Sequence, residues 1–261
     1  DHRDLHLSLR RQRQMCIRDR ANRALDDVCR AYNLPCISGK DSMKNDATLH
    51  GEKISIPPTI LFSLIGNHSD VRKAVSSDFK SAGDRIYLCG ESHYELGASE
   101  LAYMLRDETG GKSGIGGRVP EIDTTRNLAM YRALTSAMEK GLVASAHDCS
   151  DGGLAVALAE CCFGSDSGAG IDLSSIMSDC TQIDAWGAMF GESLGRILVS
   201  VKPEDCEVFE TSMADHACYA LGTVEDGDKI SVRNGEDNLT STSMSDLRSA
   251  WKGTLDGGGP Q

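Results

Sequence analysis

The stretch His147–Leu154 (HDCSDGGL) constrains this chain most, because it places two carboxylates, a hydroxyl and two glycines between an apolar run and a helix. Residues 141–146 (GLVASA) predict a short buried strand, and residues 154–162 repeat apolar side chains at four-residue steps, which predicts a helix. A Gly-rich turn that opens a helix directs backbone N–H groups and the positive end of the helix dipole at one point. Carboxylates there suit Mg²⁺, which takes oxygen ligands and commonly bridges to phosphate. The stretch therefore indicates a metal–nucleotide site.

The same residues also have a purely structural interpretation. Asp148, Ser150 and Asp151 are all good N-cap residues, and Gly152 with Gly153 is typical of a tight turn. Local physics alone leaves the two interpretations balanced, so the rest of the chain has to decide between them.

A second motif lies upstream, at residues 35–45 (PCISGKDSMKN). Gly39 frees the backbone, and Lys40, Asp41 and Ser42 follow as a cation, a carboxylate and a hydroxyl. The spacing of a Walker loop, G-x-x-x-x-G-K-[ST], is absent. Taken alone, a Gly-Lys-Asp turn is more often a solvated loop than a phosphate site.

Together, these motifs and four further blocks resemble phosphoribosylformylglycinamidine synthase, the amidotransferase-dependent ligase of purine biosynthesis. The blocks run in the family's order from about residue 21 to about residue 251. They read LPCISGKDSMKND, ISIPPTILFSLIG, SAGDRIYLCG, ELGASE, HDCSDGGLAVALAE and FGESLGRILVSV. Six ordered blocks are far more specific than either motif alone.

The resemblance implies an α/β (α+β) fold of the aminoimidazole-ribonucleotide-synthetase-like (PurM-like) type. That family's synthetase carries two tandem copies of a two-domain unit, each with an N-terminal half that forms a barrel-like dimer and a C-terminal α/β half. This chain corresponds to the end of the second copy. We expect residues 21–80 to be the end of the N-terminal, ATP-binding domain, residues 81–233 the complete C-terminal domain, and residues 234–261 a tail with a short helix.

The resemblance also implies a reaction and its partners. The family converts formylglycinamide ribonucleotide, ATP and glutamine or ammonia to formylglycinamidine ribonucleotide, ADP, phosphate and glutamate, through an iminophosphate intermediate. The implied ligands are Mg²⁺, ATP or ADP and the ribonucleotide. The implied partners are a glutaminase subunit or domain that supplies ammonia and a small bridging subunit, in the cytoplasm.

Residue roles carry over only where the motifs match. By resemblance, Asp148 is a Mg²⁺ ligand, and Asp41 is a candidate second ligand. Gly39, Lys40 and Ser150 are expected to contact the nucleotide. Several relatives carry a metal-binding asparagine at the position of Lys40, and an ammonium group cannot take that role.

Ser42, Glu192 and Ser193 are the expected substrate contacts. Glu192 and Ser193 stand where the family's first copy has a substrate-binding Glu-Ser-Gln, and Leu194 departs from that glutamine, which puts substrate binding at this copy in doubt. An ion pair between Glu192 and Arg196 is an equally weighted structural alternative.

No catalytic residue is expected in this chain, because the family's catalytic histidine lies in the first copy. We interpret the chain as a fragment that is inactive alone. One alternative is a non-catalytic scaffold half that holds a nucleotide. The other is a different ATP-using enzyme of the superfamily, such as thiamine-monophosphate kinase or selenophosphate synthetase, although GKDSMKND is not their motif.

Residues 1–20 fit none of this. They carry six arginines and three aspartates, a local charge of +3 in a chain of formal charge −12. One interpretation is a basic arm for an anionic partner. However, SLRRQRQMCIRDR resembles translated sequencing-adapter DNA, and the family pattern begins abruptly at residue 21. We therefore interpret residues 1–20 as non-native and leave them out of the predicted fold.

Composition excludes several classes of function. A pI near 5.0 argues against nucleic-acid binding, and the absence of an apolar run of about 18 residues argues against a membrane span. The ten cysteines are scattered without a C-x-x-C pair, which predicts reduced, mostly buried thiols and no thiolate metal site. Cys149 has no evident base beside it, so a covalent role is not expected.

The remaining pattern predicts alternating helices and strands around one sizeable core. Helices are expected at residues 21–33, 70–74 (capped by Ser69), 96–106, 119–140, 204–215 and 245–251. Strands are expected at residues 54–58, 59–66, 84–89 and 196–201, with a terminal hairpin of residues 217–224 and 229–232. Residues 109–118 are expected to form a loop, residues 234–242 to be loose and residues 257–259 to fray. In the longest helix, Leu128, Tyr131, Leu134 and Met138 are expected to face the core.

Overall fold

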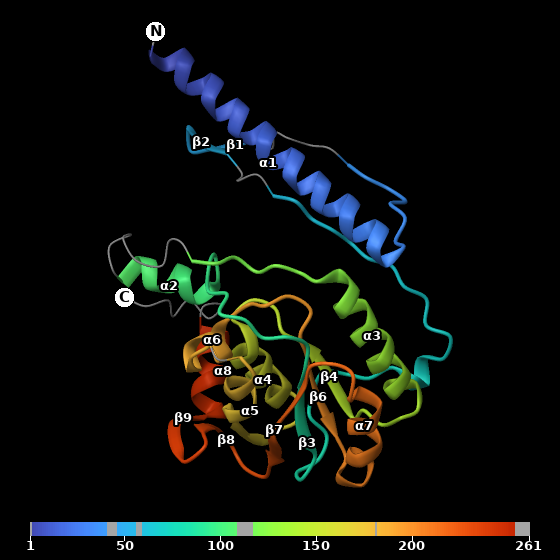
Figure 1. Cartoon of the computed structure of the whole chain (residues 1–261). Coiled ribbons are helices and arrows are strands. Elements are labelled where there is room, and N and C mark those ends of the chain that lie inside the picture. Colours follow the sequence, from blue (N-terminus) through green and yellow to red (C-terminus); the bar gives the residue numbers. More distant parts are fainter. Residues whose placement is uncertain (1, 41–45, 56–58, 109–116, 181, 254–261) are drawn as a thin grey trace. The chain divides into compact units, whose positions relative to one another are not determined.

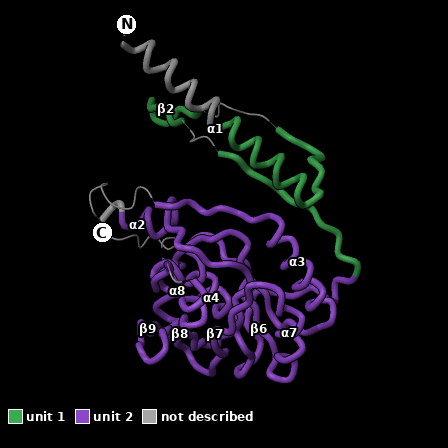
Figure 2. The backbone as a smooth tube through the Cα atoms, in the orientation of Figure 1, with its two compact units in different colours: residues 1–69 green, residues 70–261 purple. Residues whose placement is uncertain are grey.

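The computed structural model describes residues 2–40, 46–55, 59–108, 117–180 and 182–253. The chain divides into two compact units, residues 1–69 and residues 70–261, drawn in green and purple in Figure 2. The first unit holds a long helix and a strand hairpin. The second holds a seven-stranded sheet with helices packed on both faces (Figure 1).

Unit 1 contains the helix α1 (His2–Tyr32) and the antiparallel strands β1 (Asp46–Leu49) and β2 (Glu52–Ser55). The helix predicted at residues 21–33 is confirmed, but it also extends through residues 2–20. That stretch has no glycine or proline and is rich in leucine, arginine and glutamine, which favour helix.

The strand predicted at residues 59–66 is wrong. This segment has no regular structure, and its large apolar side chains between Ile60 and Ile65 are exposed. A strand needs a neighbour for its backbone hydrogen bonds, and in the described part of unit 1 the one ladder joins β1 to β2. Of the strand predicted at residues 54–58, residues 54–55 belong to β2 and residues 56–58 lie outside the described residues.

Unit 2 is built on one sheet with the strand order β4-β6-β3-β7-β5-β8-β9. Neighbouring strands are antiparallel except β5 and β8, which are parallel. The strands are β3 (Arg85–Cys89), β4 (Ser145–Asp148), β5 (Gly168–Asp172), β6 (Ile197–Val201), β7 (Cys218–Glu225), β8 (Lys229–Asn234) and β9 (Asp237–Ser243).

Alternating side chains on β3 explain why helices cover both faces of the sheet. Ile86 and Leu88 belong to one buried apolar cluster, and Tyr87 and Cys89 belong to another. Since successive side chains of a strand point to opposite faces, each cluster fills one side of the sheet. Fully burying one such aliphatic side chain stabilises the fold by roughly 1.5–3 kcal/mol. The predicted α/β class is confirmed.

Different helices complete the two clusters (Figure 1). The cluster around Tyr87 takes side chains from α3 (Thr124–Glu139) and α7 (Cys206–Met213). The cluster around Leu88 takes side chains from α4 (Gly153–Phe163), α5 (Ser174–Asp179), α6 (Ala185–Phe190) and α8 (Met244–Gly253). The helix α4 is the most deeply buried of these, because both of its cysteines and its leucines lie in the core.

Several predicted elements are confirmed with shifted ends. The strands at residues 84–89 and 196–201 are β3 and β6, and the helices at residues 154–162 and 245–251 are α4 and α8. The helix at residues 96–106 is α2 (Glu100–Glu108), and that at residues 204–215 divides into the 3-10 helix η2 (Pro203–Asp205) and α7. Most of the loop at residues 109–118 and the tail at residues 257–259 lie outside the described residues.

Two helices begin at different residues from those predicted, because an aspartate that the prediction did not consider caps each of them. The helix predicted from residue 119 begins at Thr124, where the Asp123 carboxylate accepts hydrogen bonds from two backbone N–H groups of the first turn. The short helix predicted after Ser69 is the 3-10 helix η1 (Val71–Lys73), capped by Asp70. On α3, Leu134 is buried as expected, and Leu128, Tyr131 and Met138 are half-buried. The other buried residues of this helix are Asn127, Met130 and Ala137.

Two strand predictions are corrected in unit 2. The strand predicted at residues 141–146 begins only at Ser145 and ends at Asp148, so the motif itself supplies its last two residues. The predicted terminal hairpin is wrong, because β5 lies between β7 and β8 in the sheet. The actual hairpin joins β8 to β9, and β9 occupies most of the segment that was expected to be loose.

Candidate functional site

The motif forms a strand, a turn and a helix, as the sequence predicts. The strand β4 ends at Asp148, and α4 begins at Gly153. Gly152 and Gly153 have φ angles of +77° and +63°, in the left-handed region that favours glycine. The two glycines therefore let the chain reverse within a few residues and leave Asp148 and Ser150 on the outside of the turn.

Asp148 offers an accessible carboxylate at the end of an edge strand. Its side chain is 68% exposed, and one oxygen accepts a hydrogen bond from the Ser150 hydroxyl. The other oxygen lies 3.6 Å from Nδ1 of His147. These two neighbours restrict the orientation of the carboxylate while leaving it open to a ligand.

The ring of His147 is held between two acceptors. Its Nδ1 lies 2.6 Å from the backbone oxygen of Asp148, and its Nε2 lies 3.1 Å from a carboxylate oxygen of Glu160 on α4. The ring therefore ties the end of β4 to the adjacent helix. Its contacts support a positioning role for His147 in the turn.

The carboxylate of Glu192 occupies the start of α4. One oxygen accepts hydrogen bonds from the backbone N–H of Gly152 and from that of Glu100, both at 2.9 Å. These donors lie at the starts of α4 and α2, where helices leave N–H groups without partners. The position expected to attract a phosphate is therefore already held by an anion of the protein.

Ser193 and Arg196 are buried beside Glu192. The Ser193 hydroxyl accepts a hydrogen bond from the backbone N–H of His93 at 3.0 Å. The guanidinium of Arg196 donates to the backbone oxygens of Gly191 and Ser193 and to the Ser92 hydroxyl. The predicted ion pair of Arg196 with Glu192 is not among these contacts.

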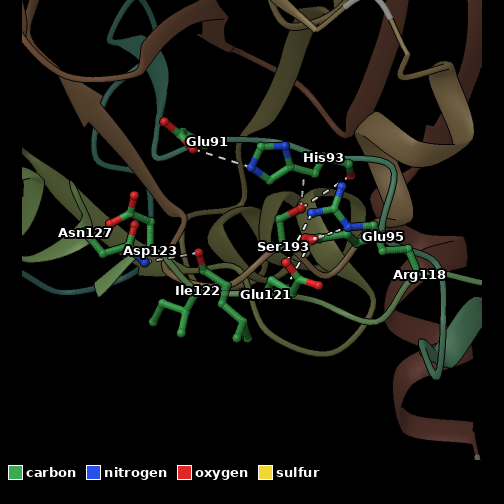
Figure 3. Close-up of a pocket in the computed structure, with 10 residues that line it drawn as sticks. Glu91, His93, Glu95, Arg118, Glu121, Ile122, Asp123, Asn127 and Ser193 are labelled. Carbon is green, nitrogen blue, oxygen red and sulfur yellow. Dashed lines mark hydrogen bonds and ion pairs between the residues drawn. The ribbon is translucent and has the colours of Figure 1, made fainter. Parts of the chain in front are cut away.

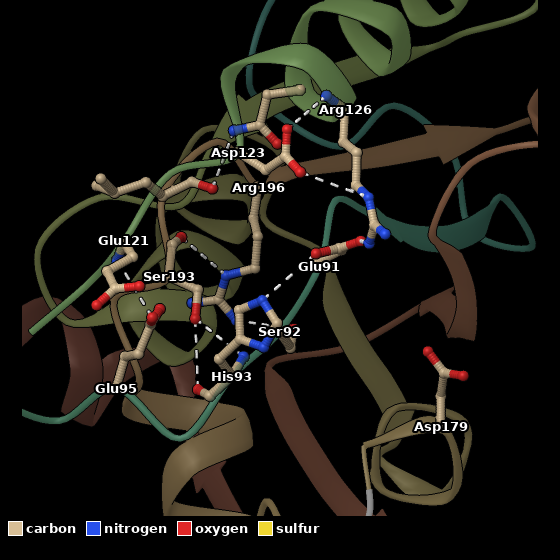
Figure 4. Close-up of polar contacts among 12 residues, drawn as sticks. Glu91, Ser92, His93, Glu95, Glu121, Asp123, Arg126, Asp179, Ser193 and Arg196 are labelled. Atoms are coloured by element: carbon tan, nitrogen blue, oxygen red, sulfur yellow. Dashed lines mark hydrogen bonds and ion pairs between the residues drawn. The ribbon is translucent and has the colours of Figure 1, made fainter. Parts of the chain in front are cut away.

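Burial of Arg196 lowers the pKa of its guanidinium, whereas Cys149 and the carboxylates of Glu95 and Glu192 act in the opposite direction. The side chain is 1% exposed, and its donors hold together the loop that carries Glu192 and Ser193. Figure 4 shows Arg196 directed between Ser92 and Ser193. Its role in the described structure is to fix this loop.

The remaining predicted site residues lie in unit 1. Gly39 and Lys40 are exposed residues of irregular backbone. Asp41 and Ser42 lie outside the described residues. The structure therefore brings Asp148 and Ser150 into contact, and it places Glu192 and Ser193 next to the same turn.

Two cavities flank these residues. One, of about 290 Å³, is lined by residues of α3, β4 and β6, including His147 and Asp148. The other, of about 200 Å³, lies near Ser193 (Figure 3). It is lined by Glu91, His93, Glu95, Arg118, Glu121, Ile122, Asp123, Asn127, Ser193 and Leu194. The sequence analysis assigned no role to most of these residues. Glu95 lies in the block ELGASE, one of the six that carry the family resemblance, and this was the sequence signal that could have indicated it.

The residues present fit a magnesium ion held mainly by water and phosphate. No three His, Cys, Asp or Glu side chains converge within the ranges that the structure describes. Mg²⁺ characteristically keeps several waters and uses one or two carboxylates together with substrate phosphates. The exposed carboxylate of Asp148 is suited to that mode of binding.

Cys149 does not have the surroundings of a nucleophile. It is 8% exposed, and burial raises the pKa of its thiol to about 11. A thiol in this state has little thiolate near neutral pH, and the thiolate is the reactive form. The structure agrees with the sequence in giving Cys149 a packing role.

None of the helices in the described ranges is both long and apolar enough to cross a membrane.

Solved structures with the same fold come from Thermotoga maritima. T. maritima PurL complexed with FGAR is 19% identical, with a TM-score of 0.60, and the match covers 68% of this chain and 30% of that chain. T. maritima PurL complexed with ATP is 18% identical, with a TM-score of 0.53 and coverage of 67% and 27%. The PurLQS structure from T. maritima is 20% identical, with a TM-score of 0.52 and coverage of 67% and 27%.

This chain thus spans less than a third of the length of those proteins. The likeness confirms the predicted PurM-like α/β fold. Residues 81–234 match the family model described as AIR synthase related protein, C-terminal domain. Because this match covers more than half of the chain, the chain belongs to the AIR synthase related family.

Proposed function

We propose that this chain is part of an ATP-dependent ligase of the phosphoribosylformylglycinamidine synthase type. Such an enzyme transfers nitrogen from glutamine or ammonia to formylglycinamide ribonucleotide, with ATP as the activating substrate. The order of the six sequence blocks, the family match and the fold shared with PurL support the proposal. The observation that carries it is the accessible Asp148 carboxylate, oriented by Ser150 at the end of β4.

Asp148 would hold Mg²⁺, and Asp41 is the proposed second ligand. The ion would neutralise charge on the phosphates of a bound nucleotide. Ser150 donates a hydrogen bond to one oxygen of the Asp148 carboxylate and so restricts its orientation. Gly39 and Lys40 are proposed to contact the nucleotide, and Ser42 the ribonucleotide substrate.

Glu192 and Ser193 are better suited to positioning than to substrate contact in this chain. Glu192 already accepts two backbone N–H groups, and Ser193 already accepts the N–H of His93. The Glu192 carboxylate would repel a phosphate that approached the same N–H groups. This arrangement supports binding of a nucleotide through Asp148 and Mg²⁺, away from the start of α4.

A nucleotide-holding scaffold is the second candidate function. It is favoured by the departure at Leu194 from the family's substrate-binding glutamine and by the occupied start of α4. In both candidates, a glutaminase and a small bridging subunit are the proposed partners, and the cytoplasm is the proposed location.

The first test is nucleotide binding by the chain itself. Isothermal titration of ADP and ATP, with and without Mg²⁺, is compared among wild type, Asp148→Asn and Asp151→Asn. Asp151 is an exposed carboxylate on the same turn and serves as the matched control. We expect Asp148→Asn to reduce the Mg²⁺-dependent affinity about tenfold, the scale of one charge-assisted contact, and Asp151→Asn to leave it nearly unchanged. Equal effects of the two variants would contradict the proposed metal site.

The ligase and the scaffold are separated by the same variant in the parent protein. Loss of turnover at saturating Mg²⁺ and nucleotide, with folding stability retained, supports chemistry at this site. Loss of folding stability supports a structural nucleotide site. Sequencing upstream of the codon for Ala21 tests the parentage directly, because a continuing frame with a further synthetase copy is expected, and a native start codon there would contradict it.

A further inference from the structure

A buried carboxylate with one unused oxygen lies in the smaller cavity. Glu95 is 0% exposed, and its Oε1 accepts a hydrogen bond from the backbone N–H of Glu121 at 3.2 Å and lies 3.7 Å from Nε of Arg118. Its Oε2 is buried and has no hydrogen-bond partner among the described residues. Buried polar atoms nearly always have a partner, because leaving one without a donor costs stability. A donor is therefore missing at this position.

The unused oxygen belongs to a residue that lines an actual cavity. The cavity measures about 200 Å³, and Glu95 forms part of its wall together with Ser193 and Asn127 (Figure 3). This volume is smaller than the roughly 300–1,000 Å³ of typical drug-sized ligand sites, so only a small molecule or one end of a larger one fits. The cavity is thus placed to bring a donor to Glu95.

The surrounding charge favours a cation. Four carboxylates line the cavity, those of Glu91, Glu95, Glu121 and Asp123. Each carboxylate has a basic neighbour: Arg118 lies by Glu95 and Glu121, and Arg126 lies by Glu91 and Asp123. The His93 ring also lines the cavity, 3.4 Å from Glu91, and Arg196 lies behind Ser193. Carboxylates therefore outnumber guanidinium groups even when all three arginines are counted, which disfavours a phosphate or a carboxylate ligand.

The geometry favours an ammonium group over a metal ion. A divalent ion needs several oxygen ligands around one point, and no such group of three acidic, His or Cys side chains exists in the described ranges. An ammonium group needs only acceptors at ordinary hydrogen-bond distances, and each of its N–H donors can take a separate one. Its first donor matches the unused Oε2 of Glu95.

We propose that this cavity binds the primary ammonium group of a small organic cation, with Glu95 as its buried acceptor. The carboxylates of Glu121 and Asp123 lie at the exposed side of the cavity, where they pair with Arg118 and Arg126; their side chains are 74% and 51% exposed. The proposal stands independently of nucleotide binding at Asp148, because none of its residues belongs to the turn that carries that motif.

The experiment uses the whole chain and two simple probes. Methylammonium chloride supplies the charge with three N–H donors, and tetramethylammonium chloride supplies the same charge with none. Thermal unfolding is followed over a concentration series of each salt, with sodium chloride at matched ionic strength. We expect a saturable rise of the melting temperature with methylammonium only.

Glu95→Gln tests the assigned acceptor, because it keeps the side-chain volume and an oxygen for the Glu121 N–H while replacing the unused oxygen with an amide. Glu207→Gln, at an exposed position of α7 that does not line the cavity, is the matched control. We expect Glu95→Gln to weaken methylammonium binding at least about tenfold and Glu207→Gln to change it by less than about threefold.

Three outcomes would overturn the proposal. One is an equal response of the wild type to methylammonium and tetramethylammonium, which needs no variant to observe. Another is undiminished methylammonium binding by a folded Glu95→Gln variant. A response to potassium or sodium as large as that to methylammonium would equally contradict an ammonium site.

Discussion

Replacing Gly153 with alanine should destabilise unit 2 more than the same change at its neighbour Gly152. Both residues have left-handed φ angles, so alanine is strained at either position. Their surroundings differ: a Cβ on Gly153 would collide with the backbone oxygen of Gly191 and lie 3.0 Å from that of Met189, whereas a Cβ on Gly152 would meet the side chain of Val156. Rotation can move the nearest methyl group of Val156 and leaves its Cβ 3.1 Å away, whereas a packed backbone cannot rotate.

The magnitudes follow from these contacts. Left-handed alanine costs roughly 1–2 kcal/mol at both positions. Overpacking against a fixed neighbour adds roughly 1–3 kcal/mol, which applies fully at Gly153 and only in part at Gly152. We therefore expect a loss of about 2–5 kcal/mol for Gly153→Ala and about 1–3 kcal/mol for Gly152→Ala.

Urea unfolding followed by tryptophan fluorescence measures this difference in the intact chain. The sequence has two tryptophans, Trp186 and Trp251, and both belong to unit 2, so the signal reports that unit alone. Equal unfolding free energies for the two variants, or a larger loss for Gly152→Ala, would refute the argument from backbone contact at Gly191.

Three further predictions concern polar groups that are buried or half-buried. Arg196→Met should lower the free energy of unfolding, measured in urea, by roughly 3–5 kcal/mol, because the buried acceptors of the guanidinium lose their donor where no water can replace it. A loss below about 1 kcal/mol would contradict this role of Arg196. Burial acts to raise the pKa of the Asp172 carboxyl, but hydrogen bonds from the N–H groups of Ser174 and Gly235 outweigh burial and lower that pKa. The carboxylate therefore stabilises the folded state above about pH 4, and this stabilisation is lost as the pH falls through the folded pKa. Asp172→Asn should therefore flatten the pH dependence of the urea midpoint below about pH 4, and an unchanged slope would contradict the assignment. Iodoacetamide at pH 7.5 should label Cys149 only after unfolding, as peptide mass spectrometry would show, because burial raises its thiol pKa to about 11; rapid labelling of the native chain would be the contrary result.

Sequence patterns predicted elements well where the local period decides them. The run at residues 84–89 is apolar on both faces, and it is a central strand with a cluster on each side. The helix α4 was predicted from its apolar repeat and its Gly-rich start. Pattern failed at two strands: β5 reads GAGID, with two glycines, and β9 reads DNLTSTS, with little apolar content. β5 is a strand because β7 and β8, which lie far from it in the sequence, pair with it, and β9 is a strand because it forms a hairpin with β8.

The candidate site was predictable in part for a similar reason. The turn with Asp148 and Ser150 is encoded within eight consecutive residues and forms as expected. The partners of Glu192 lie 92 and 40 residues away, so no local pattern indicates that its carboxylate holds the starts of two helices. Glu95 was missed because burial and an unused oxygen are properties of the packed structure.

The parallel pairing of β5 with β8 has a consequence for the order of folding. Although β7 and β8 follow each other directly in the chain, they cannot close as a hairpin, because β5 must lie between them. The hairpin of β8 and β9 can form early from local contacts, whereas its docking waits until a strand about sixty residues upstream is in position. During synthesis, the open edge of β5 therefore remains without its final neighbour until the last strands have left the ribosome. That interval is the period in which unit 2 is most exposed to pairing with another chain.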